Sequence, residues 1–229
     1  MSRWVVLAVA GLMGSAQIAS AQPNDPPTAQ ATPADSTKST ESQEEPLVGD
    51  HWTYDIRDEI TGDFKSTIVQ TITDVTATEI SIRVTALGNN NTNFLTFDRA
   101  WNLKNNGTWR YTPNDGTGVA NALAPNKTWA LKSTEVNSSA GAMWKRSGTS
   151  KVLGQESLTT RAGTFDVFKI QTTVHLQNSN DPTKKLDFVQ LTWYSTAVNH
   201  WVKRTSETRI DGKLREKSSA ELVEYGRRD

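Results

Sequence analysis

The chain has three histidines, the side chains best suited to acid–base chemistry or metal binding near neutral pH. They are His51, His175 and His200. No two of them have a metal-ligand spacing such as His-x-x-x-His, and the chain has no cysteine. We therefore predict no metal site, no disulfide and no thiol nucleophile. The sequence leaves open whether His51 meets Asp50, or His200 meets Asp166, in space.

Other catalytic patterns are also missing. No serine lies in a Gly-x-Ser-x-Gly elbow, and no glycine-rich phosphate loop precedes a helix. Asp58, Glu59 and Asp63 share one predicted hairpin, but glycoside hydrolysis needs two carboxyl groups at a set separation across a cleft. We predict no catalytic residue and no cofactor. A hydrolase with an unrecognised site stays an alternative, which a cleft that gathers His200 with two carboxylates would favour.

Tryptophan is the one unusual residue type, with eight in the chain. An indole ring can stack on a ligand, line an apolar pocket or fill a core. Three tryptophans lie in alternating strand patterns and are predicted to be core residues: Trp52, Trp129 and Trp193. Three others lie near predicted loops and are the candidate ligand-binding residues: Trp101, Trp109 and Trp144.

The elements that would position these residues are predicted to be β-strands. Apolar and polar residues alternate with period two, as at Trp52, Tyr54 and Ile56. Turn dipeptides such as Asn106-Gly107 and Asp211-Gly212 separate apolar runs. Turn signals recur about every 8–12 residues, the spacing of antiparallel sandwiches and barrels. We predict an all-β fold of about ten or eleven strands, with a strongly curved antiparallel sheet or an open or half β-barrel and little helix.

Some segments are assigned by weaker patterns. Residues 94–101 are expected to form a strand, and 113–126 a long loop. Residues 147–150, Ser-Gly-Thr-Ser, indicate a turn between two strands. Residues 195–199 indicate a short irregular or helical turn. Residues 218–225 fit a strand, with a helical turn or two as the alternative.

The N-terminus has the composition of a secretory signal over residues 1–21. Arg3 precedes an apolar stretch, and Ala19-Ser20-Ala21 fits a signal-peptidase site, so the mature chain should begin at Gln22. Residues 22–46 lack aromatic, Val, Ile, Leu and Met residues and are predicted to be a disordered linker. Residues 47–229 are predicted to form a single β domain with a short charged tail. The protein should be periplasmic or secreted, with no stable membrane anchor after cleavage.

Three motifs carry a family resemblance. Residues 154–170 resemble the "G-x-E-x-V-x-V-x-A-G-x-F-x-x-F-K-I" module of exported, uncharacterised bacterial β-domain proteins of the DUF3108 type. Residues 49–54, Gly-Asp-His-Trp-Thr-Tyr, and the Trp193-Tyr194-Ser195 and Trp201-Val202-Lys203 pair are similar to flanking motifs of those proteins. Thr196 and Ala197 depart from the usual proline there. The resemblance implies an envelope protein of unknown activity, with a curved sheet like that of LolA-type lipoprotein carriers at the level of fold only.

The 154–170 module also makes structural sense. It predicts a hairpin that turns at Gly163, with Glu156 and Lys169 able to pair across it. Phe168 and Val174 are expected on one buried face of the second strand.

Charge gives no sign of a nucleic-acid partner, because residues 47–229 carry 23 basic and 20 acidic groups, a net charge of only +3. The favoured interpretation is a non-enzymatic exported envelope protein that binds an apolar small molecule or an envelope component on a curved β surface. A structural or carbohydrate-adhesive module is the alternative. A deep apolar cavity would favour the first, and a filled core with a flat Trp/Tyr surface would favour the second.

Overall fold

A computed structural model describes residues 45–88, 91–119 and 122–227. The predicted signal and nearly all of the predicted linker lie outside these residues. In the described part the chain forms twelve strands and one short 3₁₀ helix, η1. Their bounds are β1 His51–Asp58, β2 Phe64–Val75, β3 Glu79–Ala86, β4 Thr92–Asp98, β5 Leu103–Asn105, β6 Arg110–Thr112, β7 Thr128–Asn137, β8 Ala142–Thr160, β9 Gly163–Asn178, β10 Lys185–Ser195, η1 Thr196–Val198, β11 His200–Ile210 and β12 Lys213–Gly226.

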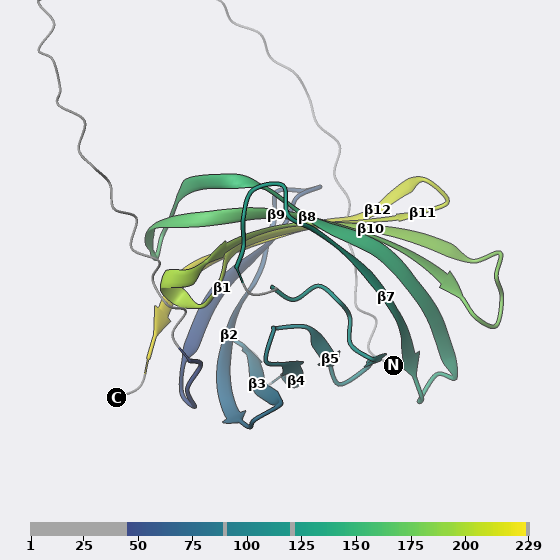
Figure 1. Cartoon of the computed structure of the whole chain (residues 1–229), viewed down its shortest axis with the longest axis horizontal. Helices are drawn as coiled ribbons and strands as arrows, with labels where there is room; N and C mark the ends of the chain where they lie inside the picture. Colours follow the sequence, from purple (N-terminus) through teal and green to yellow (C-terminus); the bar gives the residue numbers. More distant parts are fainter. Residues whose placement is uncertain (1–44, 89–90, 120–121, 228–229) are drawn as a thin grey trace, which may run out of the picture.

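The strands form one closed antiparallel barrel in which each strand pairs with its sequence neighbours. β1 closes it by pairing with both β2 and β12, and His51 lies opposite Gly226 at the seam. Figure 1 shows the long strands β7 to β12 arching over the short strands β3 to β5. The all-β antiparallel prediction is confirmed, and the sheet closes completely.

Alternation explains how the strands face the interior. Trp52 and Tyr54 of β1 are buried, as are Ile80 and Ile82 of β3, while the residues between them are more exposed or polar. These four side chains belong to the largest core cluster, which also contains Trp193, Trp201 and Leu222. Val174 of β9 is fully buried and Phe168 is half-buried.

Two local expectations are wrong, each for a physical reason, and one alternative is excluded. Residues 147–150 lie inside the continuous strand β8, where Gly148 allows a close approach: a Cβ there would lie 1.9 Å from the Thr173 carbonyl oxygen. The strand expected over 94–101 ends at Asp98, and Trp101 lies in a turn. The helical alternative for 218–225 is excluded, because Ser218 to Tyr225 pair with β1 as part of β12.

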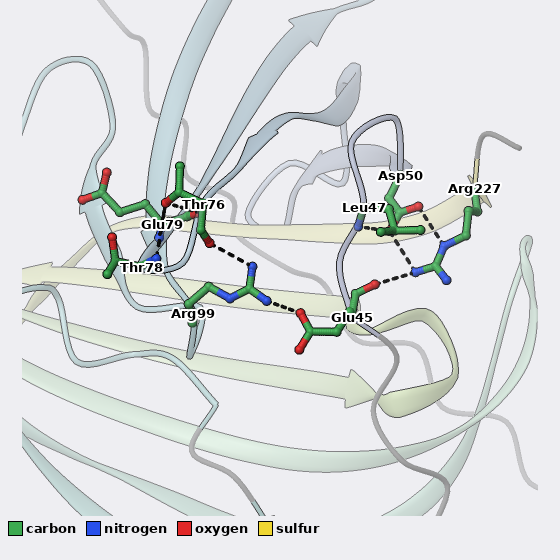
Figure 2. A network of polar contacts seen from close by, with 8 residues as sticks. All are labelled: Glu45, Leu47, Asp50, Thr76, Thr78, Glu79, Arg99 and Arg227. Carbon is green, nitrogen blue, oxygen red and sulfur yellow. Dashed lines mark hydrogen bonds and ion pairs between the residues drawn. The ribbon is translucent and has the colours of Figure 1, made fainter.

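Ion pairs hold the start of the described chain against the barrel. Figure 2 shows the Arg227 guanidinium donating to both Asp50 carboxylate oxygens, at 2.9 and 3.1 Å, and to the Glu45 carbonyl at 2.9 Å. The Glu45 carboxylate pairs with Arg99. Glu45 therefore contacts the barrel, although it falls within the segment predicted as linker. No helix in the described residues has the length and apolar character that crossing a membrane requires.

Candidate functional site: a cavity inside the barrel

The barrel interior contains a partly open cavity of about 250 Å³. Its wall combines aromatic and polar side chains from both the long and the short strands. The aromatic members are Phe97, Trp101, Tyr111, Phe188, Tyr194 and Trp201. The polar members with the strongest hydrogen-bonding capacity are Gln70, Asp115, Arg146, Gln190, His200 and Arg204. The interior is therefore neither a filled core nor a purely apolar hollow.

His200 lies at the centre of an aromatic cluster. Its ring stacks on Trp52, with centroids 4.3 Å apart and planes 25° from parallel, and meets the Trp101 ring edge-on at 4.9 Å. Trp101 has a positive φ of 61°, a conformation that a bulky residue rarely adopts. Strain of this kind persists only where the surroundings impose it. Here the Asp98 turn imposes it, since the Trp101 amide donates to the Asp98 carbonyl at 3.0 Å.

The hydrogen bonds of His200 fix its tautomer. The Tyr54 hydroxyl has one proton, and it donates this proton to the Trp201 carbonyl oxygen at 2.8 Å. The same hydroxyl lies 2.9 Å from His200 Nδ1, so Nδ1 carries a hydrogen and donates it to the Tyr54 oxygen. Burial lowers the pKa of His200 well below its usual value, with the Arg204 charge acting in the same direction. The ring is therefore neutral, and its Nε2 is an acceptor.

The loop from Pro113 to Val119 forms one wall of the cavity. Asp115 is buried, and its carboxylate accepts hydrogen bonds from the amides of Leu103 and Thr117 and from the Thr117 hydroxyl. Burial raises the pKa of Asp115 in spite of these bonds. Gly118 fits tightly, because a Cβ there would lie 2.2 Å from the Ala100 carbonyl oxygen. The loop therefore has little freedom to shift.

The two arginines of the cavity differ in their partners. Arg146 of β8 has an ion-pair partner: its Nε lies 3.4 Å from the Glu135 carboxylate without forming a hydrogen bond to it, and its Nη1 donates to the Asp115 carbonyl at 3.3 Å. Arg204 of β11 contacts the face of Trp201, with 4.6 Å from the guanidinium carbon to the ring centroid. Its Nε is buried with no hydrogen-bond partner. Burial lowers the pKa of Arg204 to about 10, so the group stays charged at neutral pH.

The structure separates the three candidate tryptophans. Trp101 lines the cavity. Trp109 is half-buried beside the Asn106-Gly107 turn, where its amide donates to the Asn106 side chain at 2.7 Å. Trp144 packs against the small apolar cluster of Leu131, Val174 and Leu176. Neither of these two is among the cavity-lining residues.

The remaining histidines lie elsewhere. The exposed His175 pairs with Asp187, with 2.6 Å from Nδ1 to the carboxylate oxygen, and the His51 ring lies 3.2 Å from the Gly49 carbonyl. Asp166 is exposed, whereas His200 is buried beside Tyr54. In the described ranges, no three His, Cys, Asp or Glu side chains gather as a metal-binding group.

Sequence reasoning missed Arg204 and Trp201 as cavity residues. Arg204 lies in a Lys-Arg-Thr-Ser-Glu-Thr-Arg run that is typical of a solvated face. If Val202 is taken to face the barrel interior, period-two alternation places Arg204 inside as well. The sequence does not show which residues of this strand face the interior. β10 and β11 change register between Trp193 and Tyr194, which shifts the alternation.

A wider hollow of about 860 Å³ adjoins Arg146. Its lining carries the basic residues Lys132, Lys145, Arg146 and Lys185 together with His175 and Asp187. Because the His175–Asp187 and Arg146–Glu135 pairs are already formed, this second hollow is the weaker candidate site.

Comparison with known proteins gives a fold but no activity. No family model matches the chain, and no curated protein matches it. A solved structure described as a "putative lipoprotein" from Parabacteroides distasonis is similar, with 16% identity and a TM-score of 0.52, covering 79% of this chain and 96% of that one. A "putative exported protein with YmcC-like fold" from Bacteroides fragilis gives 12% identity and a TM-score of 0.49, covering 79% and 97% of the two chains. The hypothetical lipoprotein YmcC of Escherichia coli gives 11% and 0.47, covering 80% and 88%.

The first of these likenesses shows a shared fold. The names of all three describe exported proteins or lipoproteins and mention no enzyme. The resemblance to DUF3108-type domains is not confirmed by any match.

Proposed function

We propose that this protein is an exported binding protein that holds one small amphipathic molecule inside its barrel. The observation that carries this proposal is the cavity, whose wall combines stacked aromatic rings with buried polar groups. Ligand sites are typically concave and apolar with a few polar groups that fix orientation. The cavity wall matches this description. Its polar groups suit an amphipathic ligand better than the apolar ligand expected from the sequence.

The size of the cavity limits the ligand. Small-molecule pockets commonly start at about 300 Å³, and this cavity, at about 250 Å³, is close to that lower end. A ligand of one or two rings suits it, whereas a polymer or a long acyl chain would not be enclosed.

A neutral and an anionic probe test binding together. Naphthalene-2-carboxamide and naphthalene-2-carboxylate are titrated into the protein by isothermal calorimetry. The variant Gln190→Trp fills the cavity, since Gln190 lies in its wall. We expect at least one probe to bind the unmodified protein and Gln190→Trp to abolish that binding.

The control is Val189→Trp, on the neighbouring position of β10, whose side chain points to the other face of the sheet. It should leave binding unchanged. If neither probe binds, or if Gln190→Trp binds as well as the unmodified protein, the proposed function is wrong.

Export is part of the proposal and has its own support. Residues 1–21 have the composition of a secretory signal, and the proteins with similar structures are described as exported proteins or lipoproteins. This chain lacks the cysteine that lipid attachment requires. Intact-mass analysis of the protein recovered from an expressing bacterium should give a chain that starts at Gln22, and a chain that retains Met1 would contradict export by cleavage.

A further inference from the structure

The Arg204 side chain occupies a central place in the barrel wall. Arg204 lies on β11 between Thr192 of β10 and Ala220 of β12. It lines the cavity, and its guanidinium lies over the Trp201 ring. A guanidinium on the face of a ring keeps its N–H groups at the edge, where they are available to a ligand in the cavity.

This guanidinium has no hydrogen bond or ion pair within the part of the chain that the structure describes. Its Nε is buried and unpartnered. The Asp115 carboxylate shares the cavity and its charge raises the pKa of Arg204, but it forms its hydrogen bonds with Leu103 and Thr117 and no ion pair with Arg204. The Nε of Arg146 also lacks a hydrogen bond, but Arg146 forms an ion pair with Glu135 and donates from Nη1 to the Asp115 carbonyl.

An unpaired charge in such a place is costly. Arg204 is half-buried, so its guanidinium has lost part of its hydration, and no hydrogen bond or ion pair within the described residues replaces that part. A hydrophobic residue of similar length would fill the same position without this penalty. The arginine is therefore better explained by a group that arrives from outside the chain.

We propose that Arg204 binds the carboxylate of the molecule held in the cavity, and that this ligand is a small aromatic monocarboxylate. This inference rests on the proposed function and specifies its ligand. One unpaired positive charge matches one negative charge, and a planar guanidinium matches a carboxylate with two parallel hydrogen bonds. The rings of Trp101, Phe97 and Trp201 form the adjoining apolar wall.

The test compares the two naphthalene probes, which have the same shape and differ in charge. Naphthalene-2-carboxylate should bind at least about tenfold more tightly than naphthalene-2-carboxamide, as is typical for a charge-assisted pair. Arg204→Met should remove that preference, and Arg204→Lys should keep part of it. Lys203→Met is the matched control, because it removes the same charge one position away, where Lys203 pairs with Glu221.

The outcomes separate the two proposals. If neither probe binds, the proposed function fails. If both probes bind with equal affinity, or if the preference survives Arg204→Met, the cavity binds ligands but Arg204 does not select the carboxylate, and only this inference fails.

A stability measurement covers the case in which Arg204 serves folding. If the Arg204 guanidinium serves to bind a ligand and does not stabilise the fold, the ligand-free Arg204→Met protein should unfold at the same temperature as the unmodified protein or at a higher one. A variant that is unfolded, or that melts well below the unmodified protein, would mean that Arg204 is a structural residue and would overturn the inference.

Discussion

At the scale of single residues, the protonation of His200 is coupled to folding in the pH range just below neutral. Burial and the Arg204 charge hold its pKa well below the usual value, so the folded protein resists taking up the proton. The unfolded chain takes it up below about pH 6.5. His200 thus contributes stability that is fully present above about pH 6.5 and is lost as the pH falls, at up to about 1.4 kcal/mol per pH unit.

Replacing His200 should therefore flatten the acid side of the stability curve. We expect His200→Gln to lose much of the decrease in unfolding free energy between about pH 6.5 and pH 5.5. Urea unfolding at a series of pH values measures this, with the exposed His175→Gln as control. The raised pKa values of the Asp115 and Glu135 carboxyl groups act in the opposite direction at lower pH, where the folded state gains protons more readily. An unchanged slope in His200→Gln would show that another group causes the loss.

Glu156 has two partners rather than the one predicted from the sequence. It pairs with Lys169 at 3.7 Å, as expected, and it also accepts the Trp193 indole N–H at 2.5 Å. Lys169→Met should change stability by less than about 1 kcal/mol, because the pair is exposed. Glu156→Gln keeps an acceptor oxygen for the indole and should also stay within about 1 kcal/mol, whereas Glu156→Leu should cost about 1–3 kcal/mol. Thermal unfolding of the three variants tests this, and an equal loss in Glu156→Gln and Glu156→Leu would be inconsistent with it.

At the scale of elements, the β8–β9 hairpin is the most extended unit of the barrel. Its strands pair from Trp144–Asn178 to Thr160–Gly163, and Arg161 at its tip forms an ion pair with Asp55 of β1. The hairpin is thus tied to the strand that closes the barrel. Its turn depends on Gly163, which has a φ of +136°.

Substitution at Gly163 should therefore be costly even though there is space for a side chain. The nearest atom to a Cβ there would be in the Phe165 ring at 3.7 Å, an ordinary contact. The backbone conformation itself disfavours a β-branched residue, so Gly163→Val should lose about 1–3 kcal/mol. Gly154→Val is the control, since Gly154 lies in β8 with open space around it and no positive φ. Equal losses in the two variants, measured by urea unfolding, would refute the conformational explanation.

Element prediction succeeded where alternation and turn chemistry agreed. The Asp211-Gly212 turn between β11 and β12 is of this kind, with both residues at positive φ. Prediction failed at Gly148, because a glycine in a turn and a glycine in a close strand contact look the same in sequence. The turn at Trp101 has no signal in the sequence. It is held by the Asp98 carboxylate, which accepts hydrogen bonds from the amides of Ala100 and Asn102.

At the scale of the whole molecule, the barrel has one thin side. β5 and β6 have three residues each and share a single pair, Asn105 with Arg110. β8 and β9 lie elsewhere in the ring and are the most extensively paired strands. The cavity lies between these unequal walls, with Leu103 and Tyr111 on the thin side.

Hydrogen exchange should reveal this asymmetry. Backbone amides of residues 103–112 should exchange much faster than those of residues 167–176, because few hydrogen bonds hold the short strands. Exchange followed by mass spectrometry measures the two segments in one experiment. Equal protection of both segments would mean that the barrel opens only as a whole.

The cavity could not be predicted from sequence for a reason that belongs to this scale. A cavity forms only when a sheet closes, and closure depends on the twist and the register shifts of all its strands. Trp101, Arg204 and Gln70 lie far apart in the chain and meet only across the closed barrel. The alternation of single strands indicates a buried face but gives no information about what that face encloses.

The seam between β1 and β12 has a consequence for how the protein is made. The first strand of the barrel, β1, cannot complete its pairing until the last strand, β12, has been made, because Trp52 pairs with Tyr225. A chain still being synthesised, or cut short before Lys213, leaves β1 and β11 each with an unpaired edge. Exposed edges recruit other strands and favour aggregation. An unfinished copy therefore differs from the complete barrel by two open strand edges, and we expect it to aggregate more readily.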